Sequence, residues 1–304
     1  MPRRNRTKGR NITGVLLLDK PLGLTSNEAL QQVKSLYQAR KAGHTGSLDK
    51  AASGLLPLCF GEATKFSGFL LNADKHYHTV FQLGAQTSTG DAEGEVVFRG
   101  ATGNLSQRRV AQTLAAFHGA IMQVPPMFSA LKHKGERLYK LAHQGLEVER
   151  EPREITIHNI DLLDYRETRL ELDIRCSKGT YIRTLAEDIG KELGCGAHVQ
   201  ALRRIGVGPY TAANMVTLAT LEHTAAAGVP GLDELLLDID SVVRDMPAVH
   251  LIEAVAFYLC QGQPVTVPQA PTQGLLRIYR EDQRFLGVGE VLPDGRVAPK
   301  RLVS

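Results

Sequence analysis

Apolar and polar residues alternate in two segments of the chain, which predicts two strands that each bury one face. From Leu170 to Cys176, every second residue is apolar and the residues between them are charged. A second alternation, with Tyr77, Thr79, Phe81 and Leu83 on one face, places His76, His78 and Gln82 on the opposite face. Because successive side chains of a strand point to opposite sides, both segments are expected in a sheet with one solvated face.

Apolar residues at helical spacing predict three amphipathic helices. One helix follows a cap at Thr25 or Ser26, a second follows a cap at Ser106, and a third ends at Gly194. Hydroxyl side chains accept hydrogen bonds from the first free N–H groups of a helix, and glycine readily takes the left-handed conformation that ends one. The apolar positions are Leu30, Val33, Leu36 and Tyr37, then Val110, Leu114 and Phe117, then Ile182, Leu185, Ile189 and Leu193.

Strands and helices do not alternate regularly, which disfavours a doubly wound parallel sheet. We predict an α+β fold with a mixed, largely antiparallel sheet and flanking helices. After Asp245 the pattern changes to short β runs at 275–279, 285–291 and 297–303, punctuated by glycine and proline. The chain of 304 residues is therefore divided into a large domain, 1–246, and a small β-rich domain, 247–304.

Residues 125–152 are expected to leave the sheet as an insertion. Prolines frame the segment, and lysines and arginines gather between Lys132 and Lys140. Its helical centre, around Leu138 and Leu141, is too short to be stable alone. We therefore expect it either to pack against the rest of the protein or to stay mobile until a partner orders it. The charges are consistent with a solvated face or with phosphate contact, and we favour contact.

The charge balance permits an RNA partner without requiring one. Lysine and arginine number 36 against 32 acidic residues, a formal charge of +4. Basic residues crowd positions 3–10, either as a solvated tail or as an arm for phosphates. No segment approaches the ~18 apolar residues of a membrane span, so a cytoplasmic protein is expected. The basic residues of this arm are Arg3, Arg4, Arg6, Lys8 and Arg10.

Common cofactor and metal motifs are missing from the sequence. It contains no GxxxxGK[ST] phosphate loop, no GxGxxG turn, no GxSxG elbow and no CxxC pair among its four cysteines. His76 and His78 share a strand face, but a third ligand at suitable spacing is lacking. We expect neither a metal nor a nucleotide cofactor.

Residues 43–65 are rich in glycine and small residues around a single carboxylate, Asp49, five residues after His44. A turn aspartate in a flexible loop is one interpretation. Glycines that let the main chain approach a ligand, beside an uncrowded carboxylate and an imidazole, also fit a catalytic loop.

Four motifs in order resemble the TruB family of tRNA pseudouridine-55 synthases. They are KPLGLTS at 20–26, the stretch around Asp49, YHTVFQLGAQTSTGDAEG at 77–94 and SKGTYIRTLAEDIGKELGCGAHVQALRR at 177–204. The resemblance implies the pseudouridine synthase fold, with a catalytic first domain and a PUA-like C-terminal domain. It also implies isomerisation of a T-loop uridine of tRNA, without a cofactor, a membrane or an obligate protein partner. The T arm is the expected contact, and the acceptor stem could reach the C-terminal domain.

The resemblance also implies residue roles. Asp49 would be the nucleophile, Tyr77 would stack on the flipped base and assist proton transfer, and Arg183 would pair with Asp49 and keep it ionised. An isomerisation that extrudes a base needs such an aromatic platform and a carboxylate charged in a dry site.

Five further residues are expected to bind substrate. Tyr181 would line the pocket and Leu202 would close its apolar wall, while His44 would support the RNA loop that the base has left. Lys20 in the first motif and Lys132 in the insertion are the other predicted contacts.

The sequence departs from the family pattern at three positions and leaves two other functions open. Ser47 and Lys50 flank the Leu-Asp pair where the family usually has threonine and proline, and Phe128 stands where tyrosine is frequent. The alternatives are a non-catalytic tRNA-binding or tRNA-folding factor and an RNP-type pseudouridine synthase that works with a guide RNA.

Overall fold

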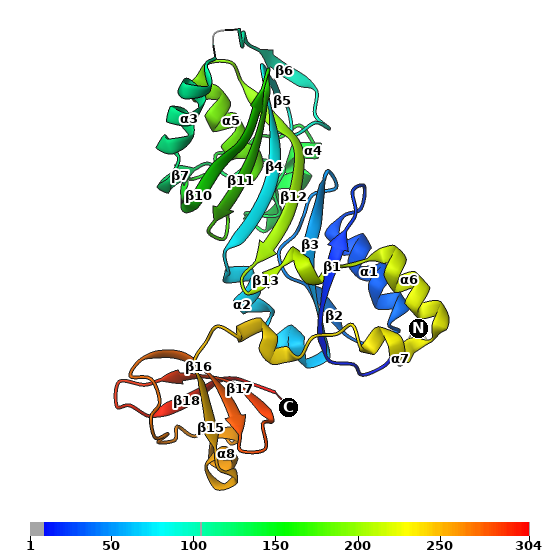
Figure 1. The fold of residues 1–304 in the computed structure, drawn as a ribbon, viewed down its shortest axis with the longest axis vertical. Helices are drawn as coiled ribbons and strands as arrows, with labels where there is room; N and C mark the ends of the chain where they lie inside the picture. Colours follow the sequence, from blue (N-terminus) through cyan, green and yellow to red (C-terminus); the bar gives the residue numbers. More distant parts are fainter. Residues whose placement is uncertain (1–8, 104, 304) are drawn as a thin grey trace.

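The computed structural model describes residues 9–103 and 105–303. Figure 1 shows an elongated molecule with a large twisted sheet and, at its lower end, a smaller one. The large sheet has ten strands in the order β14-β1-β3-β12-β4-β11-β10-β7, with β13 on β12 and β2 on β3. Within this sheet only the β1–β14 and β3–β12 pairs of described strands are parallel, so the predicted mixed, largely antiparallel sheet is confirmed. The strands are β1 (Gly14–Lys20), β2 (Ala42–His44), β3 (Ala52–Phe60), β4 (Lys75–Leu83), β7 (Gly119–Gln123), β10 (Arg153–Arg166), β11 (Arg169–Cys176), β12 (Ala197–Val207), β13 (Tyr210–Thr211) and β14 (Val216–Thr217).

The three predicted helices are confirmed with their caps. Thr25 forms a capping box with Glu28 at the start of α1, and Ser106 accepts from the main chain of Arg109 at the start of α3. Gly194 ends α5 in the left-handed conformation, at φ 79°. In Figure 1, α3 and α5 cover the β10–β12 half of the sheet, while α1 and α6 flank the β1 half. The helices of this domain are α1 (Ser26–Leu36), α2 (Ser67–Asn72), α3 (Gln107–Ala116), α5 (Ile182–Leu193), α6 (Leu218–Ala227) and α7 (Val229–Asp233), with 3-10 turns η1 (Gly61–Lys65), η2 (Ala212–Asn214) and η3 (Ile239–Val243).

Strand β1 is buried on both faces, which explains why no alternation marks it in the sequence. Leu16 and Leu18 pack in the core under the helices, and Val15 and Leu17 pack in a second core on the other side. A strand covered on both faces is apolar throughout. By contrast, β4 leaves His76 and His78 on a partly exposed face, and the alternation predicted it correctly.

The smaller sheet contains β15 (Ala248–Leu251), β16 (Gly274–Arg280), β17 (Phe285–Val291) and β18 (Val297–Leu302), with α8 (Glu253–Cys260) beside it. The predicted C-terminal β region is therefore present. The two sheets share a core, because Val288 of β17 packs with Val15 and Leu17, and the rings of Phe66 and Phe285 lie 5.6 Å apart.

Residues 125–152 extend away from the large sheet between β7 and β10. They form a small hairpin, β8 (Lys132–His133) and β9 (Glu136–Arg137), followed by the short helix α4 (Leu138–His143). Leu138 is buried, so the short helix packs against the rest of the protein, which is one of the two outcomes expected from the sequence. A second hairpin, β5 (Ala85–Thr87) and β6 (Val96–Arg99), lies at the far end of the molecule (Figure 1).

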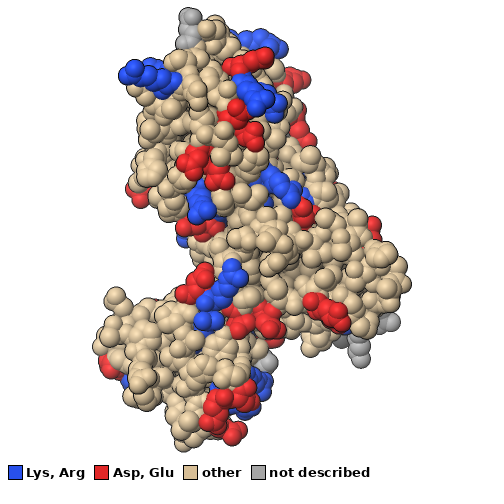
Figure 2. Space-filling view, in the orientation of Figure 1, with Lys and Arg blue, Asp and Glu red and all other residues tan. Residues whose placement is uncertain are grey.

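The basic arm falls mostly outside the described residues: Arg3, Arg4, Arg6 and Lys8 lie there. Arg10 pairs with Asp233 at the end of α7, a contact that occupies its guanidinium. On the face drawn in Figure 2, lysines and arginines lie among acidic residues rather than in one continuous stripe. In the described part of the chain, no helix combines the length and apolar character that crossing a membrane requires.

Candidate active site

Asp49 lies in a tight turn between β2 and β3, and the first motif holds this turn in place. The Ser26 hydroxyl accepts from the Leu48 N–H at 2.7 Å and donates to the Leu48 carbonyl at 3.1 Å. Gly23 donates its N–H to the Lys50 carbonyl at 2.9 Å. Contacts on both sides of Asp49 therefore fix the main chain that carries the carboxylate.

Arg183, in the first turn of α5, faces Asp49 as predicted. Its Nε lies 3.0 Å from Asp49 Oδ2. Its two terminal nitrogens donate to the carbonyls of Thr89, at 2.9 Å, and Phe128, at 2.8 Å. The guanidinium is buried, so these contacts fix it in one position beside the carboxylate.

A second carboxylate, Asp91, is buried in the same cluster. Its Oδ2 lies 3.8 Å from the guanidinium of Arg183. Its Oδ1 accepts from the Thr89 hydroxyl at 2.5 Å and from the Glu93 N–H at 3.1 Å. One arginine thus serves two carboxylates, an arrangement that the sequence analysis did not predict although Asp91 lies in its third motif.

Burial raises the pKa of Asp49 above its ordinary value of 3.8. Arg183 opposes that shift, Asp91 adds to it, and Lys20 opposes it weakly. Half of the Asp49 side chain remains exposed, but it lies in a pocket where protein replaces much of the surrounding water. The arginine therefore offsets part of the desolvation that would otherwise favour the neutral acid.

The pocket around Asp49 is lined by charged side chains and by an apolar wall. The wall includes Leu202, which is paired with Ala52 of β3 and Thr79 of β4. Leu202 lies on strand β12. The pocket is lined by Asp49, Ala51, Ala52, Asp91, Arg183, Val199, Gln200 and Leu202.

Two phenols lie within electrostatic reach of Asp49. Tyr77 on β4 is buried and Tyr181, directly before α5, is partly exposed; burial raises the pKa of both, so both are neutral at neutral pH. The buried Gln123 side chain holds the Tyr181 main chain by accepting from its N–H at 2.8 Å and donating to its carbonyl at 3.1 Å. Gln123 ends β7, so it fixes the root of the insertion beside the pocket.

His44 and Lys20 differ in how much of them a substrate can reach. His44 is partly buried on β2, and among the described residues its Nδ1 has no hydrogen-bond partner. Burial, and then the charge of Arg204, lower its pKa, which keeps the imidazole neutral. Lys20 is fully buried, its ammonium donates to the carbonyls of Pro21 and Leu24 at 2.8 and 2.7 Å, and its pKa falls to about 8. Its predicted contact with substrate gains no support from this geometry, which favours a role in shaping the 21–24 turn.

Lys132 lies on β8 with an exposed side chain, outside the pocket.

The two histidines of β4 pair with acidic side chains of β11. His76 lies 2.6 Å from Asp173, and His78 lies 2.8 Å from Glu171. Within the described ranges no three histidine, cysteine or acidic side chains come together as a metal site.

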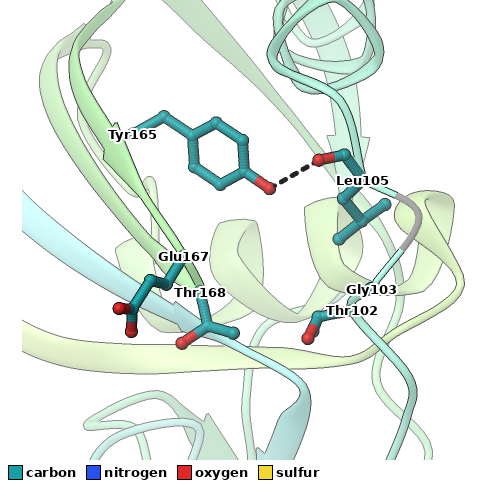
Figure 3. Close-up of a pocket in the computed structure, with 6 residues that line it drawn as sticks. All are labelled: Thr102, Gly103, Leu105, Tyr165, Glu167 and Thr168. Atoms are coloured by element: carbon teal, nitrogen blue, oxygen red, sulfur yellow. Dashed lines mark hydrogen bonds between the residues drawn. The ribbon is translucent and has the colours of Figure 1, made fainter.

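A second hollow lies between β10 and the segment before α3, and Figure 3 shows its lining. The Tyr165 hydroxyl donates to the Leu105 carbonyl at 2.8 Å, and Glu167 and Thr168 lie at its edge. No arginine or lysine lines it, so it lacks the carboxylate–guanidinium pair that distinguishes the Asp49 pocket.

Models of known protein families match most of the chain. Residues 34–182 match the model of the TruB family pseudouridylate synthase N-terminal domain. Residues 183–244 match the tRNA pseudouridylate synthase B C-terminal domain, and residues 247–303 match the C-terminal domain of pseudouridine synthase II TruB.

The chain also resembles curated proteins over its whole length. It is 55% identical over 303 residues to tRNA pseudouridine synthase B of Nitrosococcus oceani, covering 100% of this chain and 98% of that protein. It is 54% identical over 296 residues to tRNA pseudouridine synthase B of Coxiella burnetii, covering 97% and 96%.

Two solved structures share the fold. One is a Cbf5-Nop10-Gar1 complex, with a TM-score of 0.75, 24% identity and coverage of 95% of this chain and 84% of that chain. The other is an H/ACA RNP bound to a substrate RNA containing 2′-deoxyuridine, with a TM-score of 0.74, 23% identity and coverage of 96% and 85%. At these identities the structures bear on the fold alone. With domain models matched along most of its length and relatives above 50% identity, the chain belongs to the TruB family of pseudouridine synthases, which are isomerases.

Proposed function

We propose that this protein converts uridine 55 in the T loop of tRNA to pseudouridine, with Asp49 as the nucleophile. The observation that carries the proposal is the contact of 3.0 Å between Asp49 and the buried Arg183 at the end of an apolar-walled pocket. The names of the relatives, tRNA pseudouridine synthase B, support tRNA as the substrate.

The reaction rearranges one nucleoside and neither adds nor removes atoms overall. The Asp49 carboxylate attacks either C1′ of the sugar or C6 of the ring, and the bond between N1 and C1′ breaks. The ring turns, C5 bonds to C1′, the bond to Asp49 breaks and restores the free carboxylate, the proton on C5 leaves and N1 gains a proton. Water must stay out, because a detached base could otherwise be lost to hydrolysis.

The target base has to leave its stack to reach Asp49, at a cost of about a few kcal/mol. Stacking on an aromatic side chain offsets about 1–3 kcal/mol of that cost. Tyr77, buried in β4, is proposed as this platform, with Leu202 of the pocket wall beside the base. Neither Tyr77 nor Tyr181 is among the residues that line the pocket. Tyr181 is proposed to contact the base from directly before α5. The neutral imidazole of His44 is proposed to support the loop that the base has left.

The insertion at 125–152 is proposed as the contact with the T arm. The T arm is a stem closed by a loop, and such RNA is bound through its shape and its phosphates. The basic side chains of the insertion are exposed, and Gln123 and Phe128 join its root to Tyr181 and Arg183. The C-terminal domain is proposed to reach the acceptor stem. The exposed basic residues are Lys132, Lys134, Arg137 and Lys140.

Release of tritium from a tRNA transcript labelled at uridine C5 tests the proposal. The isolated chain should release it from position 55, and Asp49→Asn should abolish release while tRNA affinity is kept. Asp294→Asn, at an exposed turn of the smaller sheet, is the matched control and should leave the rate unchanged. A chain that binds tRNA without release would be a binding or folding factor. Release that requires a guide RNA and protein partners would indicate an RNP-type synthase.

A further inference from the structure

Arg204 is a buried cation without an acidic partner in the described part of the chain. Arg204 is 1% exposed, and no carboxylate of the described residues lies within 4.0 Å of its guanidinium. Buried charges are normally paired, because removing an ion from water is costly. Its neighbours add to the cost, because the ammonium of Lys75 is buried close by. Burial, and then the charge of Arg204, lower the pKa of Lys75 and of His44.

The guanidinium of Arg204 joins three elements that shape the active site. Its Nε donates to the Leu55 carbonyl of β3 at 2.7 Å, and a terminal nitrogen donates to the Gly46 carbonyl at 3.0 Å. Arg204 also lies directly opposite Tyr77 in the β4–β12 pair. Burial raises the pKa of the Tyr77 phenol, while the charge of Arg204 and a hydrogen bond from its side chain oppose that rise. Gly46 precedes Asp49 in the same turn, so one side chain contacts both the nucleophile's turn and the aromatic platform.

The direction of the Arg204–Tyr77 hydrogen bond is fixed by chemistry. A guanidinium has only donors, so the phenol oxygen must accept, and its own hydrogen stays available for another group. The charge also opposes the rise that burial causes in the pKa of Tyr77. The phenol is therefore held with its oxygen anchored and its proton free.

We propose that Arg204 is a positioning residue for the isomerisation: it anchors the Tyr77 hydroxyl so that the phenol is oriented towards the reacting base. This inference rests on the proposed function. For folding stability alone, an apolar side chain of similar volume would be better at this position, because it would avoid a buried, unpaired charge. The inference therefore gives Arg204 a functional role that stability does not explain.

A double-mutant cycle between Arg204→Lys and Tyr77→Phe tests the proposal, with single-turnover tritium release from the C5-labelled tRNA transcript. Loss of charge-assisted hydrogen bonds should slow Arg204→Lys by about 10- to 100-fold with little change in tRNA affinity. In the Tyr77→Phe background the same change should cost no more than about threefold, because the hydroxyl it anchors is already gone.

Arg203→Lys is the matched control. Arg203 is next in sequence, but it is partly exposed and pairs with Asp19 at 2.7 Å, so the change should leave the rate unaltered. If Arg204→Lys does not fold, Arg204→Met, which removes the donors and the buried charge at similar volume, replaces it in the cycle. Equal losses in both backgrounds would mean a purely structural role and overturn the inference alone. A wild-type chain that releases no tritium would overturn the proposed function, and this inference with it.

Discussion

Replacing Arg183 by methionine should slow the reaction about 100-fold. At an effective dielectric constant of about 20, unit charges 3.0 Å apart attract by about 5 kcal/mol. Removing one partner of a buried pair costs about 3–5 kcal/mol in practice, and the half-exposed Asp49 favours the lower end. At about 1.4 kcal/mol per tenfold change, about 3 kcal/mol corresponds to roughly two orders of magnitude.

The pH profile separates this electrostatic effect from misfolding. Arg183 lowers the pKa of Asp49, so its loss raises that pKa further and the ionised fraction falls at a higher pH. Single-turnover tritium release from pH 5 to 9 should therefore show an acid limb displaced upward in Arg183→Met. Arg10→Met, which removes the remote pair with Asp233, is the control and should keep the wild-type profile. A rate within about threefold of wild type and an unmoved acid limb would refute the reasoning.

Three further outcomes are expected. Lys132→Ala should weaken tRNA binding and flatten its salt dependence, measured by filter binding from about 50 to 200 mM salt; an unchanged slope would argue against contact by the insertion. Asp91→Asn removes a like charge that raises the pKa of Asp49, so the acid limb should move to lower pH, and an upward shift would contradict the assigned electrostatics. Ser26→Ala loses both hydrogen bonds to Leu48 and should reduce the rate about tenfold with tRNA affinity kept. Weakened tRNA binding with an unchanged rate would contradict a role of Ser26 in positioning Asp49.

Local patterns predicted the elements that have one solvated face. The helix ending at Gly194 and the strand carrying His76 and His78 show clear periodicity, because solvent lies on one side of each. Strands β1, β3 and β12 were not predicted. The first two are apolar on both faces, and β12 carries Arg203 and Arg204 within a strand. Their sequences therefore show neither the alternation of a strand nor the spacing of a helix.

The family motifs brought together Asp49, Arg183 and Leu202, and the structure places all three around one pocket. Asp91 and Arg204 stood in the same motifs without a role. Their importance comes from contacts between distant parts of the chain: Arg204 reaches the Gly46 carbonyl across 158 residues. No local spacing encodes such a contact.

The shared core beneath β1 has a practical consequence for any attempt to dissect the molecule. Phe66 and Val15 are shielded on one side by Phe285 and Val288 of the smaller sheet. A chain truncated before β15 would expose these apolar side chains to solvent, and the exposed apolar patch would promote aggregation. A loss of RNA affinity in such a fragment would then measure damage to the scaffold. Point changes on the outer surface of the smaller sheet are the sounder way to learn what it recognises.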